Sequence, residues 1–178
     1  MKTHSIFAIL FVAFVLVIPE ATHAYFKTGE SSFTVDGKTA IYALEYTFGH
    51  NSHEILMPVI ARNTTEKSNT ELSYEILDNK GELAKGTTLG VILSDAKIKN
   101  GMYVIPKGKS MKFTLLTFYT KGADETDTGF RTQVTNLPFS FDGKLQLGLN
   151  PSELQYYTTK LIGLGTGIGV TGVTVTTK

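Results

Sequence analysis

The sequence predicts an all-β protein whose antiparallel strands form a sandwich, and three observations support this prediction. Apolar and polar residues alternate in short runs, which places successive side chains on opposite faces of a strand. Gly, Asn, Asp and Pro separate these runs, and the resulting strand spacing of roughly 8–12 residues is typical of sandwiches and barrels. Helical periodicity is nearly absent from residue 25 onward.

Residues 1–24 have the pattern of a signal peptide, with a positively charged start followed by an apolar run at residues 6–18. Thr22 and Ala24 are small enough for the −3 and −1 positions of a signal peptidase site. The apolar run is too short to span a membrane, which takes about 20 residues. We therefore expect export to a secreted, periplasmic or cell-surface location. The remaining residues, 25–178, are expected to form one domain without a stable membrane span.

The composition excludes several classes of function. Lysine plus arginine number 17 against 16 for aspartate plus glutamate, and the net charge of +1 gives no basic field for nucleic acid. The chain has no cysteine, which excludes disulfides, cysteine-zinc sites and cysteine nucleophiles. Core packing must hold the fold, and a domain of about 150 residues buries enough surface to do so.

The first elements after the signal peptide are a turn and two strands. Residues 35–38 predict the turn, after which the side chains of residues 40, 42, 44 and 46 share one face of a strand. Residues 53–61 predict the next strand. Pro58 lies in its middle and lacks a backbone donor, so this strand is expected to lie at a sheet edge or to carry a bulge.

A hairpin follows, because residues 72–77 and 82–85 flank Asp78–Gly81, whose residues favour a tight turn. Residues 111–119 alternate over nine positions and are expected to cross the middle of a sheet. The remaining expectations are apolar runs at 91–93 and 102–105, a turn at 106–109, a loop at 121–129, strands at 130–137 and 144–149, a turn at 138–143 and a helical turn at 151–153.

Residues 74–86, followed by 103–108 and 113–115, resemble the hairpin and mid-domain strands of bacterial immunoglobulin-like modules. The resemblance covers about 45 residues and implies an immunoglobulin-like antiparallel β-sandwich. The Cys-Trp-Cys core of antibody domains is missing from this sequence. The resemblance therefore implies an architecture and no inherited binding site.

Two clusters contain residue types that ligate metals. His50, His53 and Glu54 combine imidazoles with a carboxylate, as in zinc, copper or nickel sites. Asp124, Glu125 and Asp127 supply the hard oxygen ligands that calcium prefers, although their spacing does not fit an EF-hand. Solvated loops have the same compositions, so we assign no metal to either cluster, and calcium is the one cofactor to consider.

The Gly/Thr-rich segment 161–178 is the candidate for partner binding. Apolar residues alternate there with glycines, which leaves one face of a strand without side chains. Three interpretations are open: the last strand of the sandwich, a strand added to a neighbouring subunit, and a transmembrane helix. In the second interpretation the partner-binding residues are Ile162, Leu164, Ile168 and Val170.

These observations favour a secreted or cell-surface protein that acts by binding or assembly and is not an enzyme. Its partner would be a protein or a surface polysaccharide, and self-assembly is compatible with the tail. One alternative is a carbohydrate-binding module in which Tyr156 and Tyr157 stack on a sugar. The other is a metal-dependent or carboxylate hydrolase, which needs paired carboxylates or a metal in a pocket.

Overall fold

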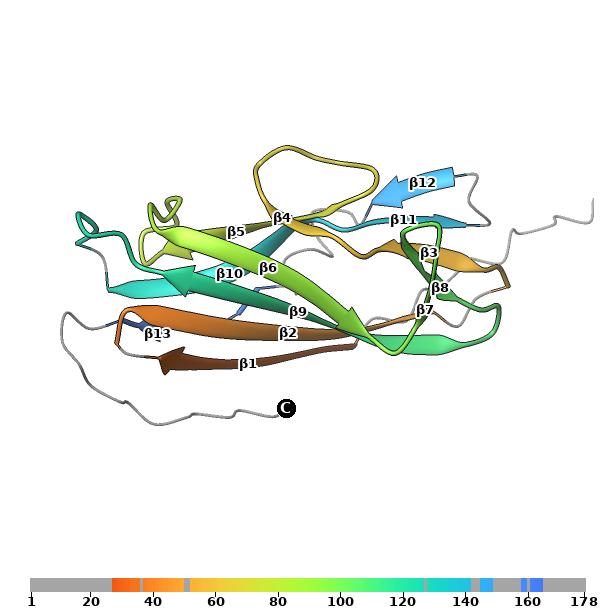
Figure 1. Ribbon diagram of the computed structural model, residues 1–178, viewed down its shortest axis with the longest axis horizontal. Coiled ribbons are helices and arrows are strands. Elements are labelled where there is room, and N and C mark those ends of the chain that lie inside the picture. The colour runs from red at the N-terminus through yellow and green to blue at the C-terminus, as the bar shows by residue number, and fades with distance from the viewer. Residues whose placement is uncertain are drawn as a thin grey trace, which may run out of the picture.

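The structure is a computed structural model. It describes residues 27–35, 37–49, 52–126, 128–141, 145–148, 158–159 and 161–164. Every regular element in these ranges is a β-strand, which confirms the all-β prediction. The strands form three sheets, and sheet A lies against sheets B and C (Figure 1). No helix in the described ranges is long and apolar enough to cross a membrane.

Sheet A consists of β1 (Lys27–Val35), β2 (Thr39–Gly49), β9 (Ser110–Thr120) and β6 (Thr87–Ser94), which are antiparallel and lie in the order β1-β2-β9-β6. Strand β9 lies between β2 and β6, which confirms that residues 111–119 cross the middle of a sheet. Gly37 and Lys38 form the turn between β1 and β2. The apolar alternation did not predict β1, because most of its residues are polar.

Sheet C consists of β13 (Ile162–Gly163), β10 (Gly129–Asn136), β5 (Leu72–Asp78) and β4 (Ala61–Asn63), in that order. Strands β4 and β5 are parallel, and the other neighbours are antiparallel. The turn at Asp78–Gly81 forms as predicted, and the Asp78 amide donates to the Glu82 carbonyl at 2.8 Å. The second arm of the predicted hairpin is reduced to a single bridge between Leu77 and Leu83.

Sheet B consists of β12 (Leu145–Gly148), β11 (Pro138–Phe141), β3 (Ile55–Pro58), β8 (Met102–Ile105) and β7 (Lys97–Lys99), in that order. Three predictions were wrong here. Residues 53–61 do not form one strand, because the chain leaves sheet B after Pro58 and enters sheet C at β4. Strand β3 lies inside its sheet, and proline is tolerated there as the terminal residue. Residues 138–141 form a strand instead of a turn, again with proline at its end.

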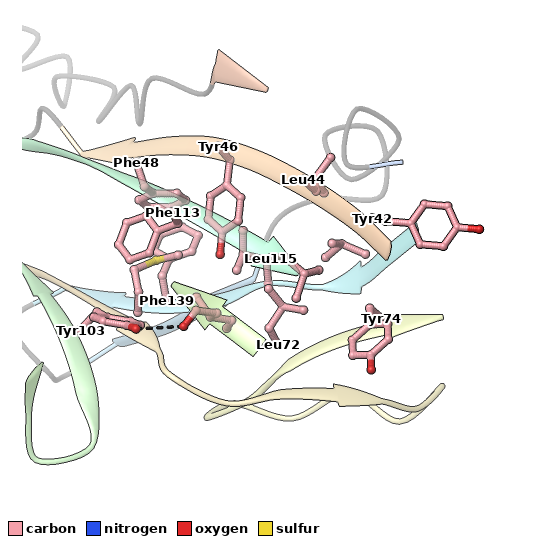
Figure 2. Packing of buried hydrophobic residues seen from close by; sticks show 14 of the residues in the cluster. Tyr42, Leu44, Tyr46, Phe48, Leu72, Tyr74, Tyr103, Phe113, Leu115 and Phe139 are labelled. Carbon is pink, nitrogen blue, oxygen red and sulfur yellow. Dashed lines mark hydrogen bonds between the residues drawn. The ribbon is translucent and has the colours of Figure 1, made fainter. Parts of the chain in front are cut away.

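The core lies between sheet A and the other two sheets, and aromatic rings fill much of it (Figure 2). The alternation predicted for residues 40–46 is confirmed, because Ala40, Tyr42, Leu44 and Tyr46 are buried. Rings from sheet A contact rings from the opposite layer at centroid distances of 4.9 Å for Phe48 with Phe139, 5.6 Å for Phe113 with Tyr103 and 4.7 Å for Tyr119 with Phe130.

One buried polar contact also joins the two layers. The hydroxyls of Thr117 on β9 and Thr132 on β10 lie 2.5 Å apart. The Thr132 amide donates to the Thr159 hydroxyl at 3.0 Å, which connects this pair to the segment that precedes β13. A buried polar group without a partner destabilises a fold, so these bonds make the threonines compatible with an apolar core.

Candidate functional site on the outer face of sheet A

Strand β6 exposes three aliphatic side chains to solvent. Leu89, Val91 and Leu93 have exposed fractions of 60%, 38% and 48%, whereas Ile92, which points inward, is 3% exposed. The four residues belong to one strand, in which alternate side chains point to opposite faces. Strand β6 is therefore apolar on both faces, and one of these faces is open to solvent.

The register extends this apolar surface across sheet A. Leu89 lies opposite Phe118 on β9, and Phe118 lies opposite Ile41 on β2. A second row joins Val91, Leu116 and Ala43 in the same way. The members on β9 and β2 are half-buried. We call this surface the outer face, and it consists of Ile41, Ala43, Leu89, Val91, Leu93, Leu116 and Phe118.

Charged side chains border the outer face at one end. Leu93 lies opposite Thr114, and Thr114 lies opposite Glu45. The Glu45 carboxylate forms an ion pair with the Lys112 ammonium at 2.8 Å, and both side chains remain largely exposed. The two rows of the outer face thus contain no charged side chain. One ion pair, neutral overall, lies at the border of the face.

The opposite face of β6 is held tightly against sheet C. Gly90 leaves room for the ring of Tyr74, because a Cβ atom at this position would lie 2.8 Å from the Tyr74 hydroxyl oxygen. Burial raises the pKa of Tyr74, and a side-chain hydrogen bond with Thr88 opposes this shift. The Tyr103 hydroxyl donates to the Ile92 carbonyl at 3.0 Å. These contacts anchor the inward side of β6 to Tyr74 of sheet C and Tyr103 of sheet B.

Glu125, from the predicted calcium cluster, fixes the start of β6. Its Oε1 accepts a hydrogen bond from the Lys85 amide at 2.8 Å. Its Oε2 accepts hydrogen bonds from the Tyr119 hydroxyl and, at 3.3 Å, from the Gly122 amide. Burial and this bond to Glu125 raise the pKa of Tyr119. Both carboxylate oxygens thus accept hydrogen bonds from the protein, while Asp124 is exposed and Asp127 lies outside the described residues.

The other predicted ligands are not brought together as a metal site in the part of the chain that the structure describes. No group of three histidine, aspartate or glutamate side chains there could hold a metal ion. The exposed ring of His53 lies 6.1 Å from the ring of Phe141, measured between centroids. Glu54 is half-buried, and His50 is outside the described residues.

The start of the segment 161–178 belongs to the protein's own sheet C. Gly163 and Ile162 pair with Gly129 and Phe130 of β10. Leu164 is buried, and its amide donates to the Thr128 carbonyl at 2.5 Å. These positions are as expected for a last strand of the fold. The remaining predicted partner-binding residues, Ile168 and Val170, lie outside the described residues.

A shallow hollow of about 420 Å³ lies where the outer face meets β8. Its lining includes Leu93, Thr114 and Tyr103, together with the carboxylate of Asp95 and the ammonium of Lys112. The hollow therefore carries one group of each charge and extends the border of the outer face.

A sugar-stacking surface needs exposed aromatic rings. Among the side chains whose burial is described, no phenylalanine or tyrosine ring is exposed. Phe118 and Phe141 are half-buried, and the other described phenylalanine and tyrosine side chains are buried. Tyr156 and Tyr157, on which the carbohydrate alternative was based, lie outside the described residues.

Sequence analysis did not identify the outer face. Its signal was present, because both phases of the alternation are apolar in residues 113–118 and again in residues 89–93. What the sequence lacked was the register that places these two stretches and residues 41–43 side by side. A comparison with protein-family models finds no match to this chain, and a comparison with curated proteins finds none either.

Proposed function

We propose that the protein is an exported, immunoglobulin-like β-sandwich that acts by binding or assembly, and that the outer face of sheet A is its binding surface. Two facing layers, built largely of antiparallel strands, support the sandwich architecture. The signal-peptide pattern of residues 1–24 supports export. The binding partner would present an apolar protein surface, because the outer face offers apolar contacts beside its one charged border.

The outer face is the observation that carries this proposal. Antiparallel sheets that face solvent on one side usually place polar residues there. Contiguous exposed apolar patches mark interaction sites in soluble proteins, whereas single exposed apolar residues do not. Here the apolar residues are contiguous over three hydrogen-bonded strands. Such a surface gains free energy when another apolar surface covers it.

Site-specific photo-cross-linking tests the proposal in the cells that produce the protein. Leu89→benzoylphenylalanine places the photoreactive group on the outer face. Ile98→benzoylphenylalanine on β7 is the matched control, because the exposed fractions of the two side chains are 60% and 61%. We expect a discrete adduct from position 89 and none from position 98. Equal labelling at the two positions, or no adduct at position 89, would contradict the proposal.

A further inference from the structure

We infer that the partner of the outer face is a second copy of this chain, bound face to face about a two-fold axis that runs parallel to the strands between β2 and β9. The inference rests on the proposed function, since it names the partner of that same surface. It follows from the order of strands, the side chains of the outer face and the charges at its border.

The strand order makes sheet A self-complementary about such an axis. The axis divides the order β1-β2-β9-β6 into equal halves, so β2 of one copy lies over β9 of the other. Because the axis is parallel to the strands, each row of one copy lies over the same row of the second copy. Ala43 therefore lies over Leu116 of the second copy, and a small side chain meets a large one. Ile41 likewise meets Phe118 of the second copy, in the nearly aligned packing that stacked sheets prefer.

The charged border is complementary in the same arrangement. Glu45 is on β2 and Lys112 is on β9, and the diagonal between them is short enough for an ion pair within one copy. The axis places Glu45 of each copy over Thr114 of the other, and Lys112 of that copy lies one row further along β9. Each carboxylate can thus reach an ammonium group of the other copy along a diagonal of one row, because both side chains are largely exposed.

The absence of charge from the two apolar rows favours a copy of the same surface over a charged partner. A charged group laid on Leu116 or Val91 would lose its hydration without gaining a counter-ion. Two copies of this face bring no such group to the contact. The net charge of +1 also leaves little long-range repulsion between two chains.

The size of the face sets the expected affinity. The three strands of the outer face lie about 4.8 Å apart, and its three rows, counting that of Leu93, lie about 7 Å apart, which gives a flat area of about 300 Å² per copy. Two copies then bury about 600 Å², which is below the roughly 1,200 Å² at which stable specific interfaces begin. We therefore expect a reversible dimer with a dissociation constant in the micromolar range, about 1 to 100 μM.

Charge exchange between two variants tests the arrangement by sedimentation equilibrium. The chain is produced by secretion, and mass spectrometry identifies its N-terminus. E45K and K112E each place like charges at both border contacts of a homodimer, and each is expected to weaken dimerisation about tenfold relative to the unsubstituted chain. Mixing E45K with K112E restores opposite charges across the interface but not within either chain. We expect the mixture to dimerise about as well as the unsubstituted chain.

Three results would overturn the inference: a monomer at all concentrations, single variants that dimerise normally, or a mixture that gains nothing. Photo-cross-linking from position 89 separates these failures from failure of the proposed function. An adduct with a different protein would overturn the second-copy inference and leave the binding surface in place. An internal adduct with residues 165–178 would show that the chain covers its own outer face, which would overturn both.

Discussion

The two faces of sheet A both carry apolar side chains and differ in what covers them. Inward, Phe113 and Tyr119 contact rings of the opposite layer, and both side chains are fully buried. Outward, Leu116 and Phe118 of the same strand lie half-buried beside exposed Leu89. Period-two alternation identifies which residues share a face. It does not identify which face is the core when both faces are apolar.

Truncating a ring on each face is the strongest test of this difference. Phe113→Ala removes a fully buried ring from between the layers and is expected to lower the free energy of unfolding by about 3–5 kcal/mol. Phe118→Ala is the matched control on the same strand. It is expected to cost less than about 2 kcal/mol, because its ring already contacts solvent. Urea denaturation measures both values, and equal losses would show that something covers the outer face in the monomer.

Raising the pH tests the buried tyrosines of the inner face. Burial raises the pKa of Tyr42 and of Tyr119, so the folded state keeps both protons at a pH where the unfolded chain loses them. The free energy of unfolding should therefore be insensitive to these groups below about pH 10. Above it, stability should fall by about 1.4 kcal/mol per pH unit for each tyrosine until the folded-state pKa is reached.

Tyr42→Phe is the control for this pH dependence. Within the described residues the Tyr42 hydroxyl has no hydrogen-bond partner, so its removal should leave stability at pH 7 within about 1 kcal/mol. Above about pH 10, the free energy of unfolding of the variant should fall less steeply with pH than that of the unsubstituted chain, by the contribution of one tyrosine. Denaturation at several pH values measures this slope. An unchanged slope would show that Tyr42 titrates normally in the folded state.

Leu89→Thr is expected to have the smallest effect on folding. The side chain is 60% exposed, and threonine suits a strand, so the free energy of unfolding should change by about 0.5 kcal/mol or less. Retention on a hydrophobic-interaction resin should nevertheless decrease, because the outer face loses its most exposed side chain. Ile98→Thr removes a similar area outside the outer face and shows the effect of exposed area alone.

The sequence predicted the elements in which one phase of the alternation is clearly apolar. The buried residues of β2 and the central position of β9 follow from residues 40–46 and 111–119. The predictions for the strand around Pro58 and for a turn at residues 138–143 were wrong. In the structure Pro58 and Pro138 are at strand ends, where the missing N–H removes no internal ladder bond.

The candidate site was harder to predict than the fold, since it depends on contacts between distant residues. Ile41, Phe118 and Leu89 form one row only through the register of three strands. Its acidic neighbours in sequence make Glu125 a candidate calcium ligand, although no metal is assigned to that cluster. Glu125 accepts hydrogen bonds from the Lys85 amide, which precedes β6, and from the Tyr119 hydroxyl on β9. The sequence around Glu125 does not predict these two contacts.

The hydroxyl contact between Thr117 and Thr132 fixes how the two layers can slide past each other. Displacing β10 along β9 by one side-chain pair would break this contact and leave one buried hydroxyl without its acceptor and the other without its donor. Apolar rings alone tolerate several such offsets with comparable contact area. A single buried polar pair can therefore select one alignment of the two layers among several that apolar contacts alone would permit.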